Sequence, residues 1–300
     1  MNDRLRSTLL AILAAALYAV MTPVSKLLQV SVPPVMGAGL LYLGAGLGMA
    51  VVIGAERVVG RTSEQPPLDS SDLRFVCAMV ALDMVAPILL MLGIARTSPQ
   101  TVSLLNNFEI VATTVIAATL FRERVSRRLA VAVCVITCAC VLLSLDGADG
   151  LGISTGALLV LGACVCWGFE NNCTASLSEK DARQVVLVKG LGSGAGSLAV
   201  SMLVGEGGAS AQGCAAMMLL GFFSVGLSVY CYVRAQSCIG AARTSAFYAT
   251  SPFIGALIGL ALFHEAPGAL FWAAFALMVV GVWLSVRDAL ADEWRRWTSS

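Results

Sequence analysis

Long apolar runs recur along almost the whole chain and constrain its fold more than any other feature. A helix needs about 20 predominantly apolar residues to cross the hydrocarbon core of a bilayer. Charged residues make up only 12% of the 300 residues, well below the roughly 25% of a soluble domain. The sequence therefore predicts an all-α polytopic membrane protein with ten transmembrane helices, at residues 8–29, 33–54, 74–95, 99–121, 128–145, 153–175, 184–204, 213–235, 242–263 and 268–288.

The basic residues are distributed asymmetrically between these runs. With ten spans, every Lys and Arg except Lys26 and Arg96 falls on one side of the membrane or close to it. Cytoplasmic segments of membrane proteins carry this excess of positive charge. We therefore expect a multi-pass protein of a bacterial-type inner (plasma) membrane, with both termini cytoplasmic.

The second half of the chain echoes the first. Residues 121–123, Phe-Arg-Glu, close the fourth predicted helix, and residues 263–265, Phe-His-Glu, close the ninth. Residues 1–150 and 151–300 then hold five helices each, and because five is odd the second copy must be inverted. Together the two repeats form one transmembrane domain. Inverted repeats with a binding site near the midplane between them are a common design of secondary transporters.

Polar side chains inside the predicted spans are candidates for function, because an ionisable group costs about 2.5–3.5 kcal/mol at a helix centre. We expect a central cavity lined by predicted helices 1, 3, 4, 6, 8 and 9, with helices 5 and 10 peripheral. Tyr230 and Tyr232 are expected on its helix 8 wall. The candidate substrate-binding or coupling residues are Glu109, Asp83, Glu170, Asn106, Asn171, Tyr18, Trp167, Tyr248 and Ser251.

Glu109 is the expected coupling residue, binding a proton or a cationic group of the substrate. The inverted copy has Ser251 at the matching position, so one carboxylate would serve both access states. Asp83 is its rival at similar depth, and two close carboxyls would share one proton. Structural roles are the alternatives for the other acids: Asp83 would hydrogen-bond a neighbouring helix, and Glu170 would pair with Lys189.

Small residues and prolines inside the spans predict how the helices pack. Pairs of glycines four residues apart let helices approach closely, and they occur at Gly44 and Gly48, Gly192 and Gly196, and Gly255 and Gly259. Proline removes a helical hydrogen bond, which predicts gating bends or fixed kinks at Pro23, Pro87 and Pro252.

Two short motifs carry a family resemblance. Residues 105–110, Leu-Asn-Asn-Phe-Glu-Ile, precede Glu123, and residues 251–252, Ser-Pro, precede Glu265. They resemble the Leu-x-x-x-Glu-Pro and Gly-Glu signature of the EamA-type family in the drug/metabolite transporter superfamily. Isoleucine replaces the proline of the first copy, and serine replaces the glutamate of the second. The resemblance implies two five-helix repeats and transport of amino acids, other metabolites or toxic compounds.

The predicted function is a secondary transporter that moves a small polar metabolite, an amino acid or a drug-like compound, with export the expected direction. An intramembrane enzyme and a facilitative channel are the alternatives. The single histidine, His264, falls at a helix end, and no Walker loop or HExxH motif occurs. We therefore expect no catalytic, cofactor, metal, nucleotide or nucleic-acid site. The expected partners are a small-molecule substrate, membrane lipid and, if transport is coupled, protons; the oligomeric state is open.

Overall fold

The computed structural model describes residues 3–60, 65–122, 125–146, 152–177 and 179–299. The first half contains α1 (Asp3–Ala19), α2 (Met21–Leu28), α3 (Pro34–Val58), a short 3-10 turn (Ser70–Asp72), α4 (Leu73–Arg96), α5 (Pro99–Leu105), α6 (Phe108–Thr119), α7 (Arg127–Ser144) and β1 (Leu145–Asp146). The second half contains β2 (Gly152–Ile153), α8 (Thr155–Ala175), α9 (Ala182–Leu203), α10 (Ala211–Gly221), a π-helical segment (Phe222–Leu227), α11 (Ser228–Ile239), α12 (Ala241–Tyr248), α13 (Ser251–Phe263) and α14 (Ala269–Ser299).

Each predicted span coincides with one helix or with consecutive helical pieces. Among the described residues, nine of these segments are long and apolar enough to cross a membrane, so the chain is a multi-pass membrane protein. The tenth is α8, which has 21 residues but is not among the nine. Its second half carries residues 170–172, Glu-Asn-Asn. These three adjacent polar residues lower the mean hydropathy of any stretch of the helix that contains them. Ten spans and an inverted second copy stay predictions.

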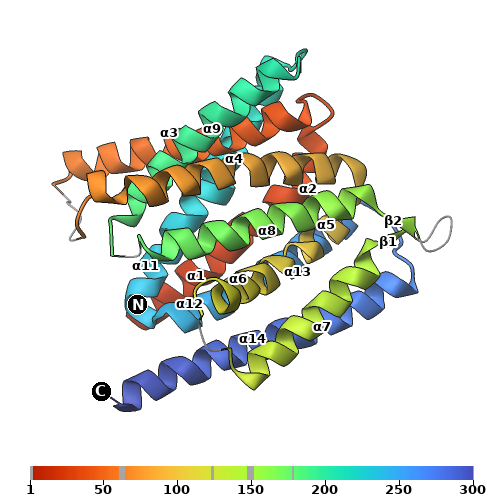
Figure 1. The fold of residues 1–300 in the computed structure, drawn as a ribbon. Coiled ribbons are helices and arrows are strands. Elements are labelled where there is room, and N and C mark those ends of the chain that lie inside the picture. The colour runs from red at the N-terminus through yellow and green to blue at the C-terminus, as the bar shows by residue number, and fades with distance from the viewer. Residues whose placement is uncertain (1–2, 61–64, 123–124, 147–151, 178, 300) are drawn as a thin grey trace.

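A two-residue antiparallel ladder is the one departure from the all-helical prediction among the described residues. Leu145 pairs with Ile153 and Asp146 pairs with Gly152, where the chain passes from α7 to α8. Figure 1 shows this ladder at the end of the bundle opposite to the two chain termini. Both termini lie at one end, which we call the terminal end.

The helices of the two halves are interleaved. The main packing partners are α3 with α9, α4 with α8, α5 with α13, α1 with α11, and α7 with α14, so each pair takes one helix from each half. In Figure 1, α3 and α9 lie along one edge and α7 and α14 along the other. Large apolar side chains of α14, such as Trp272 and Trp283, are exposed on that edge. The peripheral position predicted for these two helices, the fifth and tenth runs, is confirmed.

Three of the spans are interrupted near their middle. The first breaks between Ala19 and Met21, the fourth between Leu105 and Phe108, and the ninth between Tyr248 and Ser251. Pro23 and Pro252 follow two of these breaks, as their missing N–H groups predict, whereas α4 continues through Pro87. Helix pieces of this kind are found in transporter spans that line a cavity or bind an ion.

Glycines set the distance between α3 and its neighbours. A Cβ atom at Gly46 would lie 2.6 Å from the Leu191 nitrogen, and one at Gly190 would lie 2.5 Å from the Gly46 nitrogen. The backbones of α3 and α9 are therefore in direct contact, a packing typical of small residues in membranes. The predicted glycine pairs also lie at helix contacts: Gly44 faces Met218, and Gly48 faces Phe222.

Gly46→Ala should destabilise the protein, because the added methyl group meets backbone atoms that cannot rotate away. Overpacking of this kind costs about 1–3 kcal/mol and should lower the Tm of the purified protein in detergent. Gly54→Ala is the matched control, since Gly54 lies on the same helix and a Cβ atom added there would meet no atom within 4 Å. Equal Tm values for the two variants would contradict the close contact between α3 and α9.

Candidate functional site

An ammonium and two carboxylates meet where α4, α8 and α9 pack together. The Lys189 Nζ atom lies 2.8 Å from Asp83 Oδ2 and 3.1 Å from Glu170 Oε1. Both carboxylates are almost fully buried, with 0% of the Asp83 side chain and 2% of the Glu170 side chain exposed. The alternative pairing of Glu170 with Lys189 is therefore present, and Asp83 shares the same ammonium.

Further hydrogen bonds orient the two acids. Asp83 Oδ1 accepts from the Trp167 indole at 3.1 Å and from the Tyr42 hydroxyl at 3.3 Å. The Thr174 hydroxyl donates to Glu170 one turn away on α8. These donors come from α3 and α8, so the cluster connects four helices, α3, α4, α8 and α9. Uncompensated buried charge is costly, and this set of partners keeps the two carboxylates stable next to a single ammonium.

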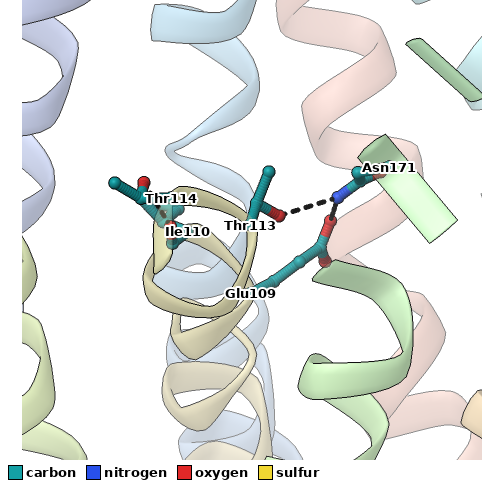
Figure 2. Close-up of a pocket in the computed structure, with 5 residues that line it drawn as sticks. All are labelled: Glu109, Ile110, Thr113, Thr114 and Asn171. Carbon is teal, nitrogen blue, oxygen red and sulfur yellow. Dashed lines mark hydrogen bonds between the residues drawn. The ribbon is translucent and has the colours of Figure 1, made fainter. Parts of the chain in front are cut away.

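Glu109, on α6, lies in a separate pocket, where its partner Asn171 is the α8 residue that follows Glu170. Asn171 Nδ2 donates to Glu109 Oε1 at 2.6 Å and approaches Thr113 Oγ1 at 3.3 Å. Figure 2 shows these contacts across the space between α6 and α8. The pocket has a volume of about 260 Å³ and is lined by these three residues together with Ile110 and Thr114. Glu109 is half-buried, so its carboxylate can be reached from the pocket.

Asp83 and Glu109 have different partners. Asp83 binds Lys189 and Trp167, whereas Glu109 binds Asn171. Within the described part of the chain, no hydrogen bond joins the two acids, so the geometry does not supply the close pair that a shared proton requires. α8 links the two sites, because Glu170 belongs to the Lys189 cluster and the adjacent Asn171 binds Glu109.

Three tyrosines stack where α1, α11 and α12 meet. The rings of Tyr18 and Tyr248 lie 5.3 Å apart, and those of Tyr232 and Tyr248 lie 5.1 Å apart with edge-to-face geometry. The Tyr248 hydroxyl is 3.4 Å from Ser228 Oγ. The structure therefore brings together Tyr18 and Tyr248, two of the predicted site residues, with Tyr232. Tyr230 lies elsewhere, as its hydroxyl donates to Glu56 at 2.7 Å.

The last two predicted site residues lie near the helix breaks. Asn106 follows the last residue of α5 and Ser251 is the first residue of α13. Both side chains are buried, and neither Asn106 Oδ1 nor Ser251 Oγ has a hydrogen-bond partner among the described residues. They do not contact the Lys189 cluster through any hydrogen bond that the structure describes.

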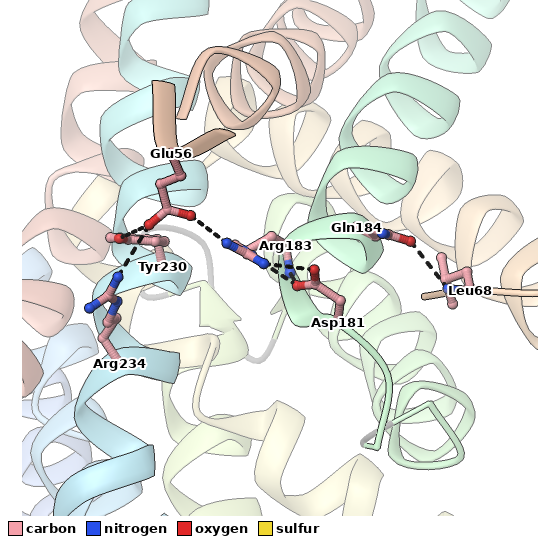
Figure 3. A network of polar contacts seen from close by, with 7 residues as sticks. All are labelled: Glu56, Leu68, Asp181, Arg183, Gln184, Tyr230 and Arg234. Carbon is pink, nitrogen blue, oxygen red and sulfur yellow. Dashed lines mark hydrogen bonds and ion pairs between the residues drawn. The ribbon is translucent and has the colours of Figure 1, made fainter. Parts of the chain in front are cut away.

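Sequence reasoning missed a polar network at the terminal end. Glu56, in the last turn of α3, accepts from Tyr230, from Arg234 at 3.2 Å and from Arg183. Arg183 also forms an ion pair of 3.0 Å with Asp181 at the start of α9, and Figure 3 shows the chain of contacts. The signal in the sequence was an acid in the last turn of one span and an arginine in the first turn of another. The network connects α3 of the first half with α9 and α11 of the second.

The comparisons with known proteins agree with this architecture. The model of the EamA-like transporter family matches the chain over residues 5–145 and 154–287. The chain is similar to a solved structure described only as "Crystal structure of protein", with a TM-score of 0.67 and 18% sequence identity. That likeness covers 95% of this chain and 97% of the other, and it concerns the fold alone. No curated protein matches the chain significantly.

Lys189→Met should lower the stability of the folded protein by about 3 kcal/mol, because it leaves two buried carboxylates without their ammonium. Adding Asp83→Asn should recover part of this loss, since one of the uncompensated charges is removed. Thermal unfolding in detergent measures both effects.

Lys180→Met is the matched control for that substitution. Lys180 forms ion pairs of 2.7 Å with the exposed Asp69 and 2.8 Å with Asp72, near the start of α4, and its ammonium holds the pKa of the Asp69 carboxyl below its usual range. Ion pairs near the surface contribute little to stability. Equal unfolding temperatures for Lys189→Met and Lys180→Met would contradict the prediction, because the buried cluster would then contribute no more to stability than a surface ion pair.

Proposed function

Because the chain belongs to the EamA-like transporter family, we propose that it is a secondary transporter that moves a small polar solute through the inner membrane by alternating access. The solute is a polar metabolite, an amino acid or a drug-like compound, and the direction is export. Transport is coupled to protons through Glu109. The observation that carries the proposal is the half-buried Glu109 carboxylate in a small pocket between α6 and α8.

The contacts of Glu109 suit a group that binds and releases a cation. Its carboxylate accepts one short hydrogen bond from a neutral amide, that of Asn171, and the structure records no ion pair to it within the described residues. A proton or a substrate ammonium can therefore bind without first displacing a resident cation. Asp83 differs, because Lys189 already occupies one of its oxygens. Ionisable residues inside a bundle commonly mark ion and substrate pathways.

The same contact joins the two halves of the protein. Glu109 lies on α6 in the first half and Asn171 on α8 in the second. Alternating access requires the halves to move against each other around a fixed site. Loading Glu109 with a proton weakens its charge-assisted bond with Asn171, and this couples the occupancy of the site to the contact between the halves.

The enzyme alternative gains no support from the family, whose description is that of a transporter. A facilitative channel differs from a proton-coupled transporter in its response to a pH gradient. A channel lets the solute equilibrate, whereas a coupled transporter accumulates it against its own concentration. Measurements with an imposed pH gradient therefore distinguish the two.

Glu109→Gln should abolish gradient-driven transport and leave folding intact, because glutamine keeps the shape of the side chain and its contact with Asn171 but cannot exchange a proton. A thermal-shift screen of amino acids and cationic dyes first identifies a solute that binds the protein, and a labelled form of that solute is used for transport. Transport is then measured in proteoliposomes with and without a pH gradient, and solute exchange without a gradient should persist in the variant.

Asp83→Asn is the comparison variant for this experiment. We expect it to retain gradient dependence, since Asp83 has a structural ion pair with Lys189. Unchanged gradient dependence in Glu109→Gln would reject Glu109 as the coupling group. Loss of gradient dependence only in Asp83→Asn would assign the coupling to the Lys189 cluster instead.

The orientation has its own test. The positive charge of the predicted loops supports a cytoplasmic position for both termini, and both lie at the same end of the bundle in Figure 1. A reporter enzyme that is active only outside the inner membrane should be inactive when it is fused after Ser300. Fusion after Val30, in the loop that follows α2, should be active, and the reverse result would invert the topology.

A further inference from the structure

Five buried side-chain oxygens lie on three helices or directly after them and have no hydrogen-bond partner among the described residues. The helices are α2, α5 and α13, which pack against one another. At least 91% of each residue is buried, by its relative exposure. The five atoms are Ser25 Oγ, Gln100 Oε1, Ser103 Oγ, Asn106 Oδ1 and Ser251 Oγ.

The three serines are exceptions among the hydroxyl groups of the spans. Ser144 Oγ donates to the Cys140 carbonyl at 2.7 Å, and Ser224 Oγ donates to the Leu220 carbonyl at 2.6 Å, each four residues back on the same helix. That bond is the usual way to satisfy a buried hydroxyl in a membrane helix. An unsatisfied buried polar group costs about 1–3 kcal/mol, so five along one contact between three helices call for a ligand.

The register of α13 against α5 brings the oxygens of these two helices to one seam. A Cβ atom at Gly259 would lie 3.1 Å from the Gln100 nitrogen, and one at Gly255 would lie 3.0 Å from Ser103 Oγ. The two helices are therefore antiparallel at this contact. Ser251 lies one helical turn before Gly255 on the same face of α13. Because the two helices are antiparallel, Ser251 lies beyond Ser103 in the direction of the chain of α5, at about the level of Asn106.

A backbone carbonyl joins the seam at the same level. The Ala19 oxygen lies 2.9 Å from the Cβ position of Gly255, close to Ser103 Oγ. In a continuous helix this carbonyl would accept from the N–H group four residues later, but that residue is Pro23, which has none. The break between α1 and α2 thus leaves an oxygen acceptor that points toward α13. Any side chain at Gly255 would fill the space between the two oxygens.

We propose that the seam between α2, α5 and α13, the oxygen seam, binds a monovalent cation of the size of Na⁺. Small hard cations take oxygen ligands, and carbonyls from broken helices bind Na⁺ in several transporter folds. None of the five side chains is ionisable, so none of the five oxygens titrates. One carboxylate lies next to the seam, because the Gln100 amide donates to Glu265, and a single negative charge matches a monovalent cation better than a divalent one. The proposal concerns ion binding and holds whether or not Glu109 couples transport.

The test uses the purified full-length protein in detergent, with NaCl, KCl or choline chloride at equal ionic strength. A ligand that binds the folded state raises the Tm in a saturable way. We expect a saturable rise with Na⁺ that neither K⁺ nor choline produces. Binding of radiolabelled Na⁺ to the same sample should saturate over the same concentration range.

Variants of the seam show where the ion binds. Ser103→Ala and Ser251→Ala should each weaken the apparent Na⁺ affinity about tenfold or more, which corresponds to about 1.4 kcal/mol. In choline chloride neither variant should lose stability, because neither hydroxyl has a protein partner to lose among the residues that the structure describes. Ser224→Ala is the matched control. Its side chain is equally buried, but its hydroxyl is satisfied by its own helix, so its Na⁺ response should equal that of the unmodified protein.

Two results would overturn the proposal. A Tm that rises equally in all three salts would mean that the oxygen seam holds water only. A Na⁺ response that survives in Ser103→Ala and Ser251→Ala would place the ion elsewhere. Glu109→Gln should keep the Na⁺ response, so a failure of the transport proposal and a failure of the ion proposal give different results.

Discussion

Lys189 lies between two carboxylates that the bundle removes from solvent, and the packing around it depends on that arrangement. Asp83 on α4 and Glu170 on α8 share its ammonium, so α4, α8 and α9 must meet at one depth and in one rotation. The Trp167 indole adds a second constraint, because its bond to Asp83 fixes the face that α8 presents to α4. Hydrogen bonds from Trp167 and Tyr42 to the second oxygen of Asp83 help to stabilise two carboxylates next to one ammonium.

Close packing of small residues makes this meeting of helices possible. In a bilayer the apolar side chains gain little by leaving lipid, so helix association depends on contact between backbones and on polar bonds. Gly46 and Gly190 bring α3 and α9 together, and Glu56 and Arg183 bond the same two helices at the terminal end. The two contacts act on one pair of helices, one through van der Waals packing and the other through charge.

The interior polar groups fall into three environments with different consequences. The Lys189 cluster and the Glu56 network are satisfied by protein partners and stabilise the packing of the two halves. The pocket at Glu109 leaves a carboxylate half-buried with one amide partner, which suits a group that binds and releases a ligand. The oxygen seam leaves acceptors without partners, within the described residues, at three broken helices, which suits an ion that stays bound while the halves move.

The sequence by itself determined the membrane class, the positions of the apolar helices and the family, because these depend on local hydropathy and on short motifs. It also identified Glu109 and Asp83 as buried acids, since a charged residue inside an apolar run is visible without a fold. It did not reveal their partners. Asn171 is far from Glu109 along the chain, as Lys189 is from Asp83, and which side chains meet depends on helix rotation, which hydropathy does not encode. The tertiary structure alone therefore decided that Asp83 belongs to an ion cluster, that Glu109 faces a pocket, and that five oxygens gather at one seam without partners among the described residues.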